Sequence, residues 1–335
     1  MSKKIISSVL AVSFLVCNLT FGASAISNPD DRTKINTAVK TVAGQLDYFI
    51  GSVKDNSDYA KKNAAVLKLI KTDTGEGWVL SNSSVLNKKY MVPHSQQYYQ
   101  PGVKGGICNK AAAMMVLSYY RDAKGYSKLP KDKKMFSELT EVFNSITKAY
   151  PWFFKNEFIN ENLDIRNGYE MLGTYEAGLA YYLFSKGYIA AAQDIIDNIS
   201  CSILRLPDAG SNMLLKFIVS FFSSWLSEKT DGKLKLSTDL KSNTDDIILG
   251  SVKKGEPVII GCLAALGNDI YAVHYFVAAG HYKMSHDIKI NGKTVYISEK
   301  EYLEVYNTWD QTSSVINWTV FKNTAIYSSI SLADF

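Results

Sequence analysis

The chain has few residues of the two types on which thiol, metal and acid–base chemistry often depend: 4 cysteines and 4 histidines among 335 residues. No cluster of these residues has the spacing of metal ligands, and no glycine-rich phosphate loop follows a predicted strand. The 37 Lys and Arg residues are scattered and nearly balanced by 32 Asp and Glu residues. The sequence therefore predicts no metal, no other cofactor and no nucleic-acid partner.

Long uncharged hydrophobic runs are also absent, except at the N-terminus. There, lysines precede an apolar run over residues 5–21, and the small residues Ala23, Ser24 and Ala25 follow it. This pattern is typical of a secretory signal peptide and is too short to span a bilayer comfortably. We expect cleavage after residues 1–25, no integral membrane segment afterwards, and a secreted protein that is extracellular or associated with the cell envelope.

After cleavage the chain retains Cys108, Cys201 and Cys262, an odd number for an exported protein. At least one thiol therefore lacks a disulfide partner within the chain. Cys201 lies in a polar and apolar segment and Cys262 in an apolar predicted strand, and neither opens a clear helix, so both are interpreted as structural or as paired with each other. Cys108 follows Gly105 and Gly106 and opens an alanine-rich apolar run that predicts a buried helix.

Cys108 is the candidate nucleophile, because a thiol in the first turn of a helix is favoured as thiolate by the helix dipole. The preceding glycines let a substrate carbonyl approach the Cys108 amide, which can donate to an oxyanion. The general base must be a histidine. The four candidates are His94, His274, His281 and His286. His274 opens a predicted strand and is our choice, with Asn307 as the group that orients it and Asp310 as the alternative.

The order of predicted elements favours an α+β fold with a cleft between a helical half and an antiparallel sheet. Predicted helices cover about 31–53, 57–70, 108–120, 135–149, 174–186, 189–199 and 212–228. Predicted strands cover 77–80, 89–93, 257–262, 274–279, 293–297 and 318–321. Residues 26–85 form a helical N-terminal extension, and residues 86–335 form the main domain with a helical insert at about 126–248.

The segment that begins at Cys108 resembles the nucleophile helix of papain-like cysteine peptidases, nearest the bacteriocin-leader (double-glycine) peptidase-like branch. That branch typically has Cys-Gly-Pro where this chain has Cys108-Asn109-Lys110. Residues 255–260 and 274–282 resemble the family's strand pair, in which Gly-x-Pro-Val precedes the strand with His-Tyr. The resemblance implies a papain-like fold for residues 86–335.

The same resemblance bears on two further site residues. Asn307-Thr308-Trp309 resembles the Asn-Ser-Trp of papain-type enzymes, whereas the leader-peptidase branch usually has Asp followed by Pro. The family also has a glutamine upstream of the cysteine that completes the oxyanion hole. Gln100, eight residues before Cys108, is our choice for it, although the papain-type spacing is six.

These observations predict a secreted bacterial cysteine peptidase that forms a thioester on Cys108 and acts on a peptide or protein substrate. The same triad also fits transglutaminase-like or cell-wall amidase acyl transfer. A third alternative is a non-catalytic secreted binding protein on a decayed peptidase fold, motivated by Asn109 and Lys110 in place of Gly-Pro. The extension, residues 26–85, is either an autoinhibitory propeptide or a permanent part of the fold.

Overall fold

A computed structural model provides the fold of part of the chain. It describes residues 49–54, 58–86, 89–91, 93–95, 99, 107–149, 174–197, 200–201, 224–234, 244–265, 271–308, 312–324 and 327–332. The predicted signal peptide, residues 1–25, and the predicted site residues Gln100 and Asp310 lie outside these ranges. Within them, no helix is both long and apolar enough to cross a membrane.

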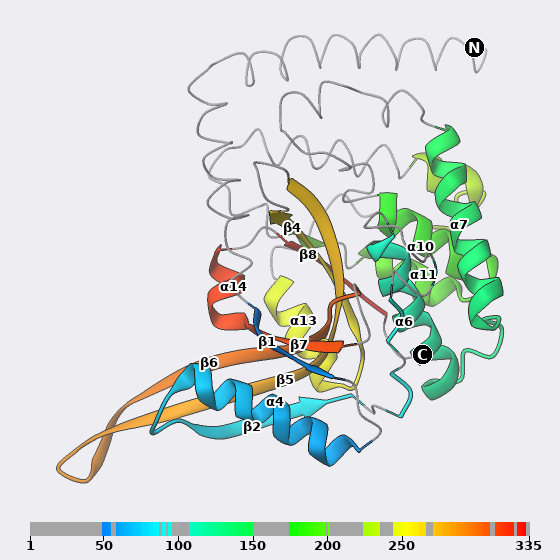
Figure 1. The fold of residues 1–335 in the computed structure, drawn as a ribbon. Coiled ribbons are helices and arrows are strands. Elements are labelled where there is room, and N and C mark those ends of the chain that lie inside the picture. The colour runs from blue at the N-terminus through cyan, green and yellow to red at the C-terminus, as the bar shows by residue number, and fades with distance from the viewer. Residues whose placement is uncertain are drawn as a thin grey trace, which may run out of the picture.

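The described strands form one antiparallel sheet in the order β1-β7-β6-β5-β4-β8-β3, with β2 paired to β5 (Figure 1). They are β1 (Phe49–Lys54), β2 (Val79–Val85), β3 (Ser200–Cys201), β4 (Val258–Ala265), β5 (Tyr271–Ile290), β6 (Lys293–Tyr306), β7 (Thr312–Asn317) and β8 (Tyr327–Ser331). Strands β5 and β6 form a long hairpin that projects from the body of the molecule. Its turn is Asn291-Gly292, and both residues have positive φ, as a two-residue hairpin turn requires.

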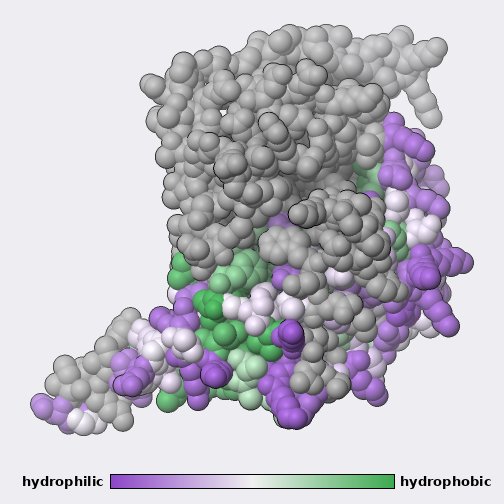
Figure 2. Space-filling view, viewed as in Figure 1, coloured by the Kyte–Doolittle hydropathy of each residue, from purple (hydrophilic) through white to green (hydrophobic). Residues whose placement is uncertain are grey.

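Helices cover both faces of this sheet. They are α4 (Tyr59–Thr74), α6 (Cys108–Ala123), α7 (Asp132–Ala149), α10 (Thr174–Ser185), α11 (Ile189–Asp197), α13 (Thr244–Lys253) and α14 (Trp318–Thr324). Because side chains alternate along a strand, Tyr275 and Val277 pack in the core built around α6, whereas Phe276 packs with α13 and α14. The outer side of α7, at the right of Figure 2, is hydrophilic.

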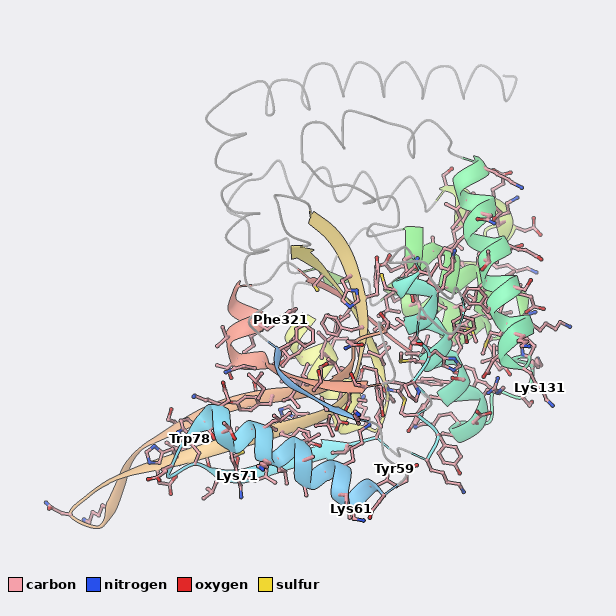
Figure 3. All side chains as sticks on the ribbon, viewed as in Figure 1. Tyr59, Lys61, Lys71, Trp78, Lys131 and Phe321 are labelled. Carbon is pink, nitrogen blue, oxygen red and sulfur yellow. The ribbon has the colours of Figure 1, made fainter. Side chains whose placement is uncertain are left out.

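Helix α4 is fixed to the sheet by a buried polar contact as well as by apolar packing. Asp58 caps the helix by accepting a hydrogen bond from the Lys61 amide at 3.2 Å. Lys61 and Lys71 are exposed on the helix, whereas Lys62 is buried (Figure 3). The Lys62 ammonium lies 3.6 Å from the buried carboxylate of Glu304 and donates a hydrogen bond to the Tyr306 hydroxyl at 2.9 Å.

These contacts bear on the N-terminal extension. Within residues 26–85, the described part supplies β1, α4 and β2, and both strands pair with strands of the main sheet. A boundary at residue 85 therefore does not separate two packed units. The autoinhibitory propeptide and the permanent part of the fold both stay predictions for this segment.

The predicted α+β class is confirmed, and so are several of its elements. Helices occur as predicted at Cys108, in the middle of the chain from α7 to α11, and at α4. Strands β5 and β6 include the predicted strands at 274–279 and 293–297 and are much longer than predicted, and β4 covers residues 258–262 of the predicted strand 257–262. Residues 224–228 of the predicted helix 212–228 are helical, and the rest of that prediction lies outside the described residues.

Three local predictions are wrong. The helix expected up to residue 53 is the strand β1 over 49–54, because these residues pair with β7, which is distant in sequence. Residues 89–90 are a turn instead of a strand. The strand expected at 318–321 is α14, where the Asn317 side chain accepts a hydrogen bond from the Val320 amide at 3.3 Å, as a helix N-cap does.

Candidate active site

Cys108 is the first residue of α6, a helix of 16 residues. The first helical hydrogen bond runs from the Ala111 amide to the Ile107 carbonyl at 2.9 Å, and no side chain of Ile107 caps the helix. Cys108 is 8% exposed. The thiol therefore lies at the positive end of the helix dipole, which favours the thiolate.

His274 lies near the start of β5 and is 4% exposed. Burial lowers the pKa of the His274 ring to about 4, while a hydrogen bond to the main-chain carbonyl of Asn307 opposes this shift. The ring is therefore neutral at pH 7 and able to accept a proton. The contact joins His274 with Asn307, which the sequence also predicted, but it uses the carbonyl of Asn307. The Asn307 side-chain amide donates to Ser314 Oγ at 3.4 Å.

Thr308 is a residue of this site that sequence reasoning missed. It has a φ of 64°, which is unfavourable for a β-branched residue, and it is fully buried. Its hydroxyl donates to the carbonyl of Tyr275 at 2.9 Å and so ties the strained residue to the strand that carries His274. Backbone strain of this kind concentrates at functional sites. Here the hydrogen bond of Thr308 holds the turn that contains the Asn307 carbonyl. A positive φ at threonine leaves no signal in the sequence.

Cys262 lies beside His274 on the face of the sheet that packs with α13 and α14, whereas Cys108 packs in the core on the α6 face. Burial raises the pKa of the Cys262 thiol to about 12, and the negative charge of the Cys108 thiolate adds to this effect. The two cysteines are therefore within electrostatic range of each other. Cys262 is also the direct β4 partner of His274 on β5, and paired residues in an antiparallel ladder have their side chains on the same face of the sheet.

The alternative of a disulfide between Cys201 and Cys262 is wrong, because Cys262 carries a free thiol. The sheet order gives the reason. Strand β8 lies between β3, which carries Cys201, and β4, which carries Cys262. Backbones two strands apart are separated by about 10 Å, beyond the Cα separation of about 7 Å that a disulfide can bridge.

A pair of tyrosines connects the start of α6 with β5. The Tyr175 hydroxyl donates to the main-chain carbonyl of Asn109 at 2.7 Å, and the Tyr175 ring lies 4.7 Å from the ring of Tyr275. Tyr275 follows His274 directly. This contact fixes the residue after Cys108 against the residue after His274, and neither tyrosine was assigned a role from the sequence.

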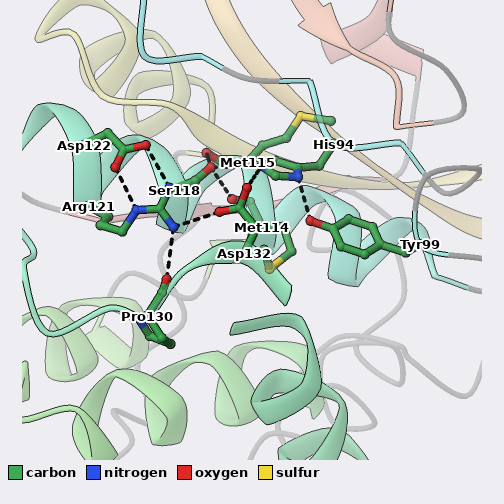
Figure 4. A network of polar contacts seen from close by, with 9 residues as sticks. All are labelled: His94, Tyr99, Met114, Met115, Ser118, Arg121, Asp122, Pro130 and Asp132. Carbon is green, nitrogen blue, oxygen red and sulfur yellow. Dashed lines mark hydrogen bonds and ion pairs between the residues drawn. The ribbon is translucent and has the colours of Figure 1, made fainter. Parts of the chain in front are cut away.

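The other three histidines have different surroundings. His94 is buried beside the second half of α6, where it contacts Ser118 Oγ at 3.1 Å and Tyr99 Oη at 2.6 Å (Figure 4). His281 lies 3.4 Å from a carboxylate oxygen of Glu301. The His286 ring lies beside Trp78, at 5.6 Å between ring centroids.

No group of three or more His, Cys, Asp or Glu residues in the described ranges has an arrangement that could hold a metal ion. Comparison with known proteins gives no family. No family model matches the chain, no curated protein is similar to it, and no solved structure matches its fold.

Proposed function

We propose that this protein is a secreted cysteine peptidase with a papain-like fold, in which Cys108 is the nucleophile, His274 the general base and Asn307 the group that orients the base. The observation that carries the proposal is the hydrogen bond between the His274 ring and Asn307, beside a cysteine that is in electrostatic range of Cys108. Cys108 at the first turn of α6 supports it further.

In this mechanism the neutral His274 ring accepts the proton of the Cys108 thiol, and the thiolate attacks the carbonyl carbon of the peptide bond. The C–N bond then breaks, the leaving amine takes the proton from His274, and a thioester remains on Cys108. Water hydrolyses the thioester with His274 again as the base. The carbonyl of Asn307 fixes the orientation of the ring and stabilises its charged form while it holds the proton.

The oxyanion of each tetrahedral intermediate requires hydrogen-bond donors. The main-chain amide of Cys108 is one such donor, since it is among the amides at the start of α6 that have no acceptor within the helix. Gln100 remains the proposed side-chain donor and lies outside the described residues.

The experiment compares the mature protein with Cys108→Ser and Cys262→Ser on a mixture of unstructured peptides, with products identified by mass spectrometry. We expect Cys108→Ser to lower cleavage by at least about 10³-fold, as loss of a catalytic nucleophile does. Cys262→Ser is the matched control, a second buried thiol close to the site, and it should retain most of the activity. Full cleavage by Cys108→Ser contradicts the proposal.

Two other outcomes identify the alternatives. Incorporation of a primary amine into the peptides, or release of muropeptides from cell walls, with the same dependence on Cys108 assigns the thioester to another acyl transfer. A Cys108 that reacts no faster than an ordinary thiol assigns the chain to a binding protein on a decayed peptidase fold.

A further inference from the structure

Asn109, the residue after the proposed nucleophile, has a side-chain amide that is only half satisfied. The residue is fully buried. Its Oδ1 accepts a hydrogen bond from the Lys110 amide at 2.6 Å, while Nδ2 has no hydrogen-bond partner among the described residues. Buried polar atoms in native proteins nearly always have a partner, so a donor without one calls for an explanation.

The hydrogen bond to Lys110 shows where this amide group lies. Main-chain N–H groups of a helix point towards its N-terminus, and those of the first turn have no acceptor within the helix. Because Oδ1 accepts from one of them, the Asn109 side chain is folded over the N-terminal end of α6. Its Nδ2 is therefore at the same end of the helix as the Cys108 amide and thiol.

The main chain at Asn109 is also held in place. Its carbonyl accepts the hydrogen bond from Tyr175, and Tyr175 packs against Tyr275, the neighbour of His274. The main chain that carries the donor is thus held against strand β5 through Tyr175. Such preorganisation is what a group that stabilises charge in a transition state needs.

We propose that Nδ2 of Asn109 donates a hydrogen bond to the carbonyl oxygen of the acyl substrate and to the oxyanion formed from it. This inference rests on the proposed function of Cys108. When the Cys108 sulfur forms its bond to the carbonyl carbon, the π electron pair moves to oxygen, and Nδ2–H and the Cys108 N–H share the resulting charge. The pair returns when the C–N bond breaks and the amine leaves with the proton from His274.

This role gives a meaning to the departure from the Cys-Gly-Pro pattern. Glycine has no side chain to donate, whereas Asn109 adds a donor directly beside the nucleophile. Asn109 is in this account a catalytic residue of an active enzyme and not a mark of decay.

The test uses two reactions of the same thiol in the full mature chain. Acylation by p-nitrophenyl acetate passes through an oxyanion, whereas alkylation by iodoacetamide does not. The variant Asn109→Ser keeps a side-chain oxygen that can accept from the Lys110 amide, but it replaces the two N–H donors of Nδ2 by one O–H on a shorter side chain. We expect it to lower the rate of Cys108 acylation by about 10²-fold or more and to change alkylation by less than about twofold.

Asn109→Asp is a second variant of the same shape that retains the oxygen acceptor. It should lower acylation at least as much, because a carboxylate repels the oxyanion. In Asn109→Ser, equal losses in both reactions or unchanged acylation overturn the inference and leave the proposed function standing. Absence of any acylation of Cys108 in the wild-type chain overturns both. Circular dichroism of each variant verifies that the fold is retained.

Discussion

Polar side chains lie near both ends of helix α6, and the two ends differ in whether these side chains have hydrogen-bond partners. In its second half, His94, Ser118 and Arg121 belong to a network in which the polar groups contact one another and Asp132 (Figure 4). At its first turn, Nδ2 of the buried Asn109 has no partner among the described residues. We call the network in the second half of α6 the closed network. We infer that the closed network stabilises the fold, whereas the unpartnered donor at the first turn of α6 binds the acyl substrate.

The closed network includes a histidine whose hydrogen bonds define its tautomer. The Ser118 hydroxyl donates to the Met114 carbonyl at 2.6 Å, so the contact with His94 Nε2 requires the ring to donate. Nδ1 then accepts from the Tyr99 hydroxyl. Burial lowers the pKa of His94 and favours this neutral form. Both ring nitrogens are in use, which makes His94 a poor candidate for a general base.

The largest expected effect on stability is a loss in acid that depends on the buried His274. The pKa of His274 is lowered from 6.5 to about 4 in the folded protein, so the unfolded chain binds more protons between these values. The contribution of this pKa shift to the free energy of unfolding is fully present above about pH 6.5. It is lost as the pH falls towards 4, which lowers the free energy of unfolding by roughly 3 kcal/mol in all. Urea unfolding at several pH values measures this loss, and His274→Gln should reduce its slope. A slope unchanged in the variant contradicts the assignment.

Next in size is Arg121→Met, which removes the cation at the centre of the closed network. Its guanidinium donates to Asp132 at 2.7 Å and to the Pro130 carbonyl at 3.0 Å, and it contacts Asp122 through two further bonds. We expect a loss of about 2–3 kcal/mol in the free energy of unfolding. Lys133→Met on the exposed side of α7 is the control and should change stability by less than about 0.5 kcal/mol. Alkylation of Cys108 should be unaffected.

A smaller loss is expected for His94→Phe, which keeps a ring but removes the hydrogen bonds to Ser118 and Tyr99. We expect about 1–2 kcal/mol in thermal or urea unfolding, and no change in the reactivity of Cys108. If this variant slowed Cys108 as strongly as His274→Ala does, the division between the two regions of α6 would be wrong.

The smallest effect on stability belongs to the first turn. Asn109→Ser retains an acceptor for the Lys110 amide and removes Nδ2, which has no partner among the described residues. We expect a change of less than about 1 kcal/mol in unfolding free energy. His94→Phe should therefore lose more unfolding free energy than Asn109→Ser. Asn109→Ser should lose more of the Cys108 acylation rate than His94→Phe. The reverse result for both quantities would contradict a role of the first turn of α6 in acylation.

The sequence predicted those elements whose signal is local. The helix at Cys108 has an alanine-rich apolar run with no Gly or Pro, and α7 repeats buried residues at Met135, Leu139 and Phe143. β1 was missed because it depends on pairing with β7. α14 was missed because Trp318 and Phe321 favour strands by propensity, whereas the Asn317 cap and the stacking of these two rings favour a helix.

For the candidate site, the sequence identified the residue types and their order but not their contacts. His274 and Asn307 were predicted together, and the structure joins them through a main-chain carbonyl, which no sequence pattern encodes. The positive φ of Thr308 depends on tertiary contacts in the same way. The residue after the cysteine was seen as a departure from a family pattern, and its half-satisfied amide became visible only in the fold.

The most direct measurement is alkylation of the mature protein by iodoacetamide across pH, with modified cysteines mapped by mass spectrometry in wild type and His274→Ala. The account predicts that Cys108 reacts first near neutral pH, that Cys262 reacts slowly because burial raises the pKa of its thiol, and that His274→Ala slows Cys108 by about tenfold or more. A Cys108 that reacts equally fast without His274, or more slowly than Cys262, would contradict it.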